Sequence, residues 1–206
     1  MAGVFVSEAP IKGTQRGEKI KEIRLSGRGG QGVVIASEII VHAAMIDGLY
    51  GHSIPSFGTE RRGSPVLSSV RIDDRPIREK TLVYLPDCII ASDPTLLGAA
   101  NVFAGIRKGA IMVLNSSREI ESVDLPPQIT RVGIVNATKI AFKTLGIPVT
   151  NTVMVGAFAV ATGWVRVSST IEAIRQLMPA ELVEKNVEAS RRGAEEIRIL
   201  DIRRDY

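Results

Sequence analysis

The stretch that most constrains the fold of this chain is LSGRGGQGVVIA, residues 25–36. Its glycines Gly27, Gly29 and Gly32 stand in the spacing G-x-G-x-x-G, and the positions between them are Arg28, Gly30 and Gln31. Apolar and polar residues alternate before the motif, as in a strand, and the apolar run VVIASEIIVHAAMI follows it. Strand, Gly-rich turn and helix open a βαβ unit, so the motif predicts a Rossmann-like layered α/β fold.

Three short apolar runs predict further buried strands: CIIA (88–91), IMVLN (111–115) and VGIV (132–135). Turn or capping residues follow each run, as at Asp93-Pro94 and Asn136, and we expect helices after them. The sheet is therefore expected to be mainly parallel.

The last third of the chain predicts helices. VMVGAFAVATGWV (153–165) is expected to be a buried helix because it is too short to span a membrane, and we expect no membrane span in this chain. SSTIEAIRQLM and AELVEKNVEASRRGAEEIRIL predict two C-terminal amphipathic helices. With no internal repeat or linker visible, we expect a loose N-terminal arm at 1–20 and a single domain at 21–206.

Composition narrows the function classes. The net charge is +4, from 26 basic and 22 acidic residues, which hints at an anionic partner. Aromatic residues make up only 4% and are scattered, which disfavours nucleic-acid binding. Cys88 is the sole cysteine, and His42 and His52 are the only histidines, so the chain by itself offers no metal site. The N-terminal stretch lacks the apolar run of a signal peptide, and we expect a cytoplasmic chain.

A glycine loop of this kind is suited to an anion, because backbone N–H groups and the helix dipole both favour negative charge. A NAD site also needs a carboxylate about 20 positions further on. Residues 49–54, LYGHSI, contain none, and Arg28 would occupy the space of a pyrophosphate. A turn that merely packs helix against strand remains an equal alternative.

A second unusual loop is SIPSFGTERRGSPV, residues 53–66. The βαβ topology predicts that it lies beside the glycine loop, so the two loops would form one polar surface. Solvated charge is the default interpretation of an Arg pair. The flanking Pro and Gly residues favour a shaped loop instead. The residues of interest here are Phe57, Glu60, Arg61, Arg62 and Pro65.

Catalytic groups are scarce. No serine lies in a G-x-S-x-G elbow, and neither histidine has a triad setting. His42 is expected to be a packed, hydrogen-bonded residue of an apolar helix, and Cys88 to be an inert strand residue. We therefore predict no catalytic residue in this chain.

Four ordered blocks together resemble the gamma subunit or domain of the 2-oxoacid:ferredoxin oxidoreductases, such as pyruvate synthase and 2-ketoisovalerate oxidoreductase. They are IRLSGRGGQG (23–32), PSFGTERRGSPV (55–66), PDCIIASDPTLL (86–97) and GIPVTNTVMVGAFAVATG (146–163). The resemblance covers most of residues 22–200, so the expected domain at 21–206 is of the gamma type.

The resemblance implies a subunit of an oxygen-sensitive complex of anaerobic metabolism (EC 1.2.7 type). Such a complex decarboxylates a 2-oxoacid, joins the acyl group to coenzyme A and passes electrons to ferredoxin or a similar acceptor. Thiamine diphosphate and iron–sulfur clusters would be held by the other chains, namely catalytic alpha and beta (thiamine-binding) subunits and a ferredoxin-like delta subunit. This chain would not be catalytic alone.

We hypothesise that residues 27–32 and 60–62 line the surface where the gamma chain meets the catalytic subunits and contacts coenzyme A. Phe57 and Pro65 belong to the same expected interface. A docking role alone is equally compatible with the sequence. Two alternative hypotheses are an independent NAD(P)-binding Rossmann oxidoreductase and a purely structural scaffold subunit.

Overall fold

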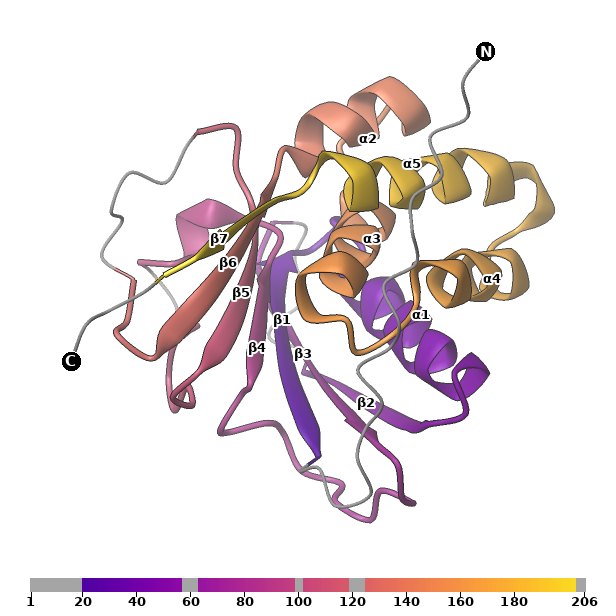
Figure 1. Cartoon of the computed structure of the whole chain (residues 1–206). Helices are drawn as coiled ribbons and strands as arrows, with labels where there is room; N and C mark the ends of the chain where they lie inside the picture. The colour runs from indigo at the N-terminus through magenta and orange to yellow at the C-terminus, as the bar shows by residue number, and fades with distance from the viewer. Residues whose placement is uncertain (1–19, 57–62, 99–101, 119–124, 203–206) are drawn as a thin grey trace.

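The computed structural model of the chain describes residues 20–56, 63–98, 102–118 and 125–202 (Figure 1). In this part of the chain seven strands form one sheet, in the order β2-β3-β1-β4-β5-β6-β7. The strands are β1 Lys21–Arg28, β2 Tyr50–Ser56, β3 Pro65–Asp73, β4 Cys88–Ala91, β5 Ala110–Asn115, β6 Ile129–Val135 and β7 Arg198–Asp201. The helices are α1 Val33–Ile46, α2 Ala137–Leu145, α3 Asn151–Thr162, α4 Val167–Leu177 and α5 Val183–Glu196, with 3₁₀ turns η1 Pro94–Leu96 and η2 Ala180–Leu182.

The centre of the sheet is parallel and its margins are antiparallel. Strands β1, β4, β5 and β6 pair in parallel with their neighbours. Strand β3 runs antiparallel between β1 and β2, and β7 runs antiparallel to β6. Only residues 57–64 join β2 to β3, and a parallel connection needs a dozen residues or more. The short connection therefore forces β3 to turn back.

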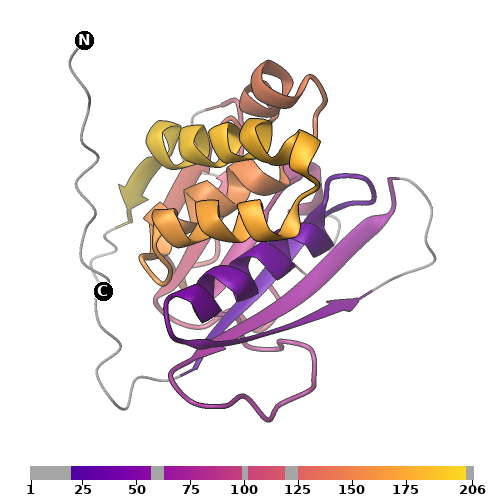
Figure 2. The same cartoon turned by 90° about the vertical axis from the view of Figure 1, so that its right-hand side faces the viewer.

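The helices of the described chain lie together on one side of the sheet (Figure 2). Side chains that alternate along the strands divide the two faces. Ile23 and Leu25 of β1 and Ile90 of β4 join the helices in the main core. Helix α3 lies at its centre, with most of its residues buried.

The opposite face carries no helix in the described residues except the short turn η1. Met112 and Leu114 of β5 pack there against Ile129 of β6 and Leu125. A smaller cluster joins Ile89 of β4 to segments that follow it in the chain. Loops instead of helices therefore cover this face.

The structure confirms the α/β fold class, the buried helix α3 and the two amphipathic helices α4 and α5. Asn136 caps α2 as expected, because its Oδ1 accepts from the N–H of Lys139 at 3.0 Å. Asp93-Pro94 begins only a 3₁₀ turn, which corrects the helix expected there. No helix follows β5 within residues 116–118, and the short exposed strand β7 was not foreseen.

The expected N-terminal arm falls almost wholly on residues 1–19, which lie outside the described residues. Among the helices that are described, none combines the length and apolar character needed to cross a bilayer.

Helices α3 and α5 touch backbone to backbone through two glycines. A Cβ on Gly156 would lie 1.9 Å from the carbonyl oxygen of Ser190, and one on Gly193 would lie 2.1 Å from that of Val153. Because backbone atoms cannot rotate away as a side chain tip can, any larger residue would push the two helices apart.

We expect Gly156→Ala to lower the free energy of unfolding by about 1–3 kcal/mol, the usual range for overpacking a core. The measurement is chemical denaturation of the purified chain. Gly98→Ala is the matched control, since a Cβ there meets nothing within 4 Å and φ is not positive. It should change stability by no more than about 0.5 kcal/mol. Equal stabilities for the two variants would contradict the close helix contact.

Candidate functional site at the carboxyl edge of the sheet

The order of the strands reverses direction between β1 and β4. From β1 the chain moves to β2 and β3 on one side, and the later strands β4, β5 and β6 lie on the other. In open α/β sheets the carboxyl ends of the strands at such a reversal diverge and leave a crevice where ligands bind. The glycine loop leaves β1 at this point.

The glycine loop is a strand end followed by a left-handed turn. Gly27 and Arg28 still belong to β1, where Arg28 faces Pro65 of β3. Gly30 and Gly32 have φ of +96° and +76°, a backbone region that residues other than glycine rarely adopt. Gly32 is the N-cap of α1, and no side chain caps the helix. The first N–H groups of α1 therefore have no acceptor within their own helix.

Gln31 folds back onto the loop. Its Oε1 accepts from the N–H of Arg28 at 2.7 Å, and its own N–H donates to the carbonyl oxygen of Arg28 at 3.0 Å. The carboxamide oxygen thus satisfies one of the backbone donors that an anion in the loop would use. Any anion in this loop must rely on the remaining donors or displace the Gln31 side chain.

Arg28 ties the glycine loop to two other segments. Its Nε lies 2.7 Å from Oδ2 of Asp93, and its Nη2 donates to the Thr95 hydroxyl at 2.7 Å. Its Nη1 donates to the carbonyl oxygen of Gly63 at 3.1 Å. The Arg28 side chain therefore links the end of β1 to the segment after β4 and to the segment before β3.

The second loop returns to the sheet against the first. The N–H of Gly29 donates to Ser64 O at 2.9 Å, and the N–H of Gly63 donates to Gly29 O at 3.2 Å. Pro65 is exposed at this position. The end of the second loop is therefore adjacent to the glycine loop, as the topology predicted. Of its other expected interface residues, Phe57, Glu60, Arg61 and Arg62 lie outside the described residues.

A fourth segment meets the glycine loop at the start of α3. A Cβ on Gly32 would lie 2.6 Å from Nδ2 of Asn151, the first residue of that helix. The N-termini of α1 and α3 are thus neighbours, and their dipoles both favour negative charge nearby. Next to them the hydroxyl of Thr150 is buried and has no hydrogen-bond partner in the structure.

An open pocket adjoins this edge beyond β4. Its volume is about 640 Å³, and it is lined by Pro94, Thr95, Asn115, Ser116, Ser117, Arg118, Asn136, Thr138, Lys139 and Phe142. The lining contains two cations and no carboxylate, and Lys139 lies in the first turn of α2. Thr95, which binds Arg28, joins the pocket to the glycine loop. The whole edge is suited to a polyanion.

The geometry counts against a NAD site. In a dinucleotide fold the second strand lies beside the first and ends in a carboxylate that binds the ribose. Here the antiparallel strand β3 separates β2 from β1, and β2 carries no carboxylate. The spacing G-x-G-x-x-G is therefore present without the ribose-binding carboxylate that accompanies it in a NAD site.

The described residues offer few side chains that could bind a metal or take part in redox chemistry. No cluster of three or more His, Cys, Asp or Glu residues that could hold a metal occurs there. Cys88 is fully buried, and its burial, with the nearby Asp87, raises the pKa of its thiol. His42 Nε2 pairs with Oε1 of Gln176 at 3.1 Å, away from the crevice. With one cysteine in the sequence, these residues do not fit an iron–sulfur cluster.

Sequence reasoning missed the partners of Arg28 and most of the pocket. The sequence predicted Asp93 only as a capping residue. The structure confirms the cap, since Asp93 Oδ1 accepts from the N–H of Thr95. Asn151 and Lys139 received no role. One available signal is that Asp93 and Asn136 each lie within two residues of the end of a parallel strand. The carboxyl ends of such strands share one edge of the sheet.

Comparison with known proteins gives a consistent result. The family described as pyruvate ferredoxin/flavodoxin oxidoreductase matches residues 22–196. The common gamma subunit of the pyruvate/ketoisovalerate oxidoreductases of Pyrococcus abyssi is 44% identical, with 88% of this chain and 99% of the relative covered. The gamma subunit of NADH-dependent phenylglyoxylate dehydrogenase of Aromatoleum evansii is 42% identical, with coverages of 89% and 97%.

A solved structure has the same fold. The pyruvate oxidoreductase subunit PORC of Thermotoga maritima superimposes with a TM-score of 0.76 at 31% identity, covering 88% of this chain and 99% of that subunit. The match covers most of this chain, so the α/β fold is shared with that subunit.

The carboxylate of Asp93 should make stability depend on pH. Partial desolvation raises its pKa, but hydrogen bonds from the hydroxyl and N–H of Thr95 and from Arg28 outweigh it, so the pKa lies below the ordinary 3.8. A carboxyl with a lowered folded-state pKa stabilises the fold above its unfolded-state pKa and loses this effect as the pH falls.

We therefore expect Asp93→Asn to lower the thermal midpoint at neutral pH, and the difference from the unsubstituted chain to shrink below pH 3.8. Thermal unfolding of both chains across this pH range is the measurement. Glu195→Gln, at an exposed position of α5, is the control and should not lower the thermal midpoint at neutral pH. A difference that stays constant with pH would show that the Asp93 carboxylate is not held as described.

Proposed function

We propose that this chain, which belongs to the pyruvate ferredoxin/flavodoxin oxidoreductase family as a gamma-type member, is the gamma subunit of a multisubunit 2-oxoacid:acceptor oxidoreductase. The complex oxidatively decarboxylates a 2-oxoacid to an acyl-coenzyme A and passes the electrons to ferredoxin or a similar acceptor. Within it the chain contributes contacts to coenzyme A and to its partner subunits.

One observation carries the proposal: Arg28 gathers separate segments of the chain at one edge of the sheet. It binds Asp93 and Thr95 after β4 and the carbonyl of Gly63 before β3. Asn151 packs against the same loop at Gly32. These residues belong to the four segments that resemble the gamma family. Because the four segments meet at one edge of the sheet, a shared function for them is supported.

Coenzyme A fits the chemistry of this edge. It carries a diphosphate and a ribose phosphate, and the edge offers two helix N-termini at Gly32 and Asn151 together with two cations, Arg118 and Lys139. The pocket volume of about 640 Å³ is in the range of small-molecule sites. Phe142 is 54% exposed at its rim and offers an aromatic face for the adenine ring.

The chain's own residues supply binding and orientation only. A buried thiol with a raised pKa is not a nucleophile, and the pocket lining contains no acid–base pair. Thiamine diphosphate supplies the carbanion chemistry of decarboxylation and iron–sulfur clusters carry electrons. We assign both to the alpha, beta and ferredoxin-like delta partners, with this chain positioning coenzyme A beside them.

Removing the two pocket cations should weaken coenzyme A specifically. We expect Arg118→Ala with Lys139→Ala to raise the KM for coenzyme A about 10-fold or more, since a hydrogen bond to a charged group contributes about 1.5–3 kcal/mol. The KM for the 2-oxoacid should not change. Steady-state dye reduction by the anaerobically purified complex measures both constants.

Lys143→Ala is the matched control, because Lys143 is an exposed cation of the same helix that does not line the pocket. If the complex with both substitutions is intact and its KM for coenzyme A is unchanged, the pocket does not bind coenzyme A. Loss of the complex itself, with normal kinetics in what remains assembled, would favour a docking role alone.

The hypothesis that the chain is a purely structural scaffold subunit makes a different prediction for the second loop, residues 53–66. If it holds, Arg61→Ala with Arg62→Ala should weaken assembly and leave the KM for coenzyme A unchanged. If the loop contributes to coenzyme A binding, the KM should rise in the fraction that assembles. Size-exclusion chromatography followed by kinetics on the assembled peak separates the two.

A further inference from the structure

Three large apolar side chains stand exposed on the face of the sheet opposite the helices. Leu82, Tyr84 and Leu85 are 37%, 68% and 52% exposed, and we call them the apolar ridge. Val83 between them is buried, so its side chain turns inward where those of Leu82 and Tyr84 reach solvent. Single exposed apolar residues are ordinary, but neighbouring ones of this size mark binding surfaces.

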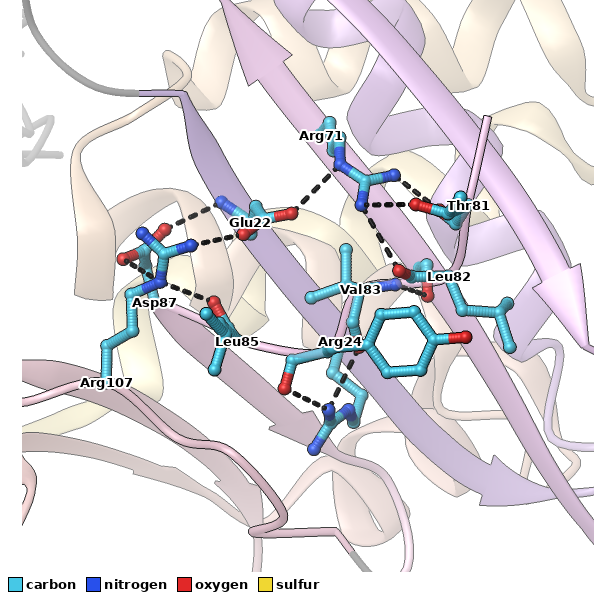
Figure 3. A network of polar contacts seen from close by, with 11 residues as sticks. Glu22, Arg24, Arg71, Thr81, Leu82, Val83, Leu85, Asp87 and Arg107 are labelled. Atoms are coloured by element: carbon cyan, nitrogen blue, oxygen red, sulfur yellow. Dashed lines mark hydrogen bonds and ion pairs between the residues drawn. The ribbon is translucent and has the colours of Figure 1, made fainter. Parts of the chain in front are cut away.

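The backbone beneath the ridge is fixed by three arginines. Arg71 donates to the carbonyl oxygens of Thr81 and Leu82, and Arg24 to those of Val83 and Tyr84. Arg107 donates to the carbonyl oxygen of Leu85 at 2.7 Å. Five consecutive carbonyls therefore accept from guanidinium groups, several of which Figure 3 shows converging on this segment.

Two of the three arginines, Arg24 and Arg71, are buried, and Arg107 is half-buried. Glu22 bridges two of them, with Oε1 2.9 Å from Arg71 Nε and Oε2 2.6 Å from Arg107 Nη2 (Figure 3). The Arg71 side chain is 5% exposed, and burial lowers the pKa of Arg24. Arg24 also donates to the carbonyl oxygens of Val102 and Ala104. Charges buried in this way are costly, and here they hold a segment whose outer side faces solvent.

A rigid backbone under exposed apolar side chains is the arrangement expected of a docking surface. Association is stronger when the contacting residues are ordered beforehand, because less conformational entropy is lost on binding. Tyrosine is also among the residues enriched at the energetic centre of interfaces. None of Leu82, Tyr84 and Leu85 belongs to the buried core of the isolated chain.

The rim of the ridge is basic. Arg78 and Lys80 precede it, and Lys108 follows the arginine that binds Leu85; all three are exposed. Glu79 is the only exposed acidic residue among 75–85 and 104–109. A complementary surface would therefore present an apolar pocket bordered by carboxylates.

We infer that the apolar ridge docks a different subunit of the same oxidoreductase, one that offers an apolar pocket rimmed by aspartate and glutamate. The inference rests on the proposed function, since it requires a complex. It assigns assembly to the face opposite the helices, apart from the carboxyl edge where Arg28 lies. The chain then carries two functional surfaces.

Charge distinguishes this occupant from two others. A second copy of this chain would bring its own Arg78, Lys80 and Lys108 against the same cations. The N-terminal residues 1–19 carry three cations, Lys12, Arg16 and Lys19, and two acidic residues, Glu8 and Glu18. Neither supplies the carboxylate rim that the ridge requires.

Site-specific photo-crosslinking tests the inference in the whole complex. A photoreactive phenylalanine analogue replaces Tyr84, and the complex is purified anaerobically, irradiated and mapped by mass spectrometry. We expect one principal crosslink, to another subunit, within a segment that contains apolar and acidic residues. The same analogue at Tyr50, which is 48% exposed on β2, is the control and should give no crosslink to that segment.

Four results would overturn the inference: a crosslink to a second copy of this chain, a crosslink to its residues 1–19, no crosslink from position 84, or an equal yield from position 50. If no 2-oxoacid oxidation co-purifies with the chain, the proposed function itself fails. If the activity co-purifies and position 84 does not crosslink, only the inference about the ridge fails.

A variant series gives an independent readout. Leu82→Ser with Tyr84→Ser and Leu85→Ser should weaken assembly at least 100-fold, measured by titration of the chain into the remaining subunits. The free chain should remain folded, as its thermal unfolding transition will show, because all three side chains lie outside the buried core. At saturating concentrations the KM for coenzyme A should be normal. Undiminished assembly would overturn the inference.

Discussion

The alternation of side chains along β1 is the constraint on which the rest of the structure depends. Ile23 and Leu25 enter the core under the helices, while Glu22 and Arg24 face the other way. A shift of one residue in register would place the charges under α1 and the apolar side chains among guanidinium groups. The pairing of β1 with both β3 and β4 holds this register, and both proposed functional surfaces start from it.

The two surfaces use arginine in different ways. Arg28 lies at the surface of the carboxyl edge and joins loops by contacts that leave 38% of its side chain exposed. Arg24 and Arg71 are interior residues that satisfy backbone carbonyls. The planar guanidinium suits both tasks because it presents several donors in fixed directions. A lysine at these positions could not bind several segments in one plane.

The two proposed surfaces divide the work of the chain, with one for a ligand and one for a partner subunit. In the proposed function, the chain must hold coenzyme A at a defined distance from the reacting centre on another subunit. The sheet links the ridge to the carboxyl edge, since β1 carries Arg24 at its middle and Arg28 at its end. Rigidity between the two surfaces then fixes the position of the ligand.

Much of the fold followed from local patterns. The strand and helix around 27–32, the buried helix α3 and the amphipathic helices α4 and α5 each carry a periodicity that the sequence displays directly. The alternation of side chains over residues 66–72 also predicts a strand there, and β3 confirms it. Its antiparallel direction does not follow from that alternation, although the short connection from Ser56 to Pro65 contains this information. Strand β7 is four exposed residues long, and its pairing with β6 arises only from tertiary packing.

By itself the sequence determined the glycine loop, its place before α1 and the family to which the four blocks point. Only the tertiary structure decided that Asp93 and Thr95 are the partners of Arg28, that Gln31 closes part of the loop, and that three arginines hold residues 81–85. The physical reason is distance along the chain. Periodicity reports which face a residue takes, whereas contacts between Arg28 and Asp93 or Arg24 and Val102 join residues more than 60 positions apart.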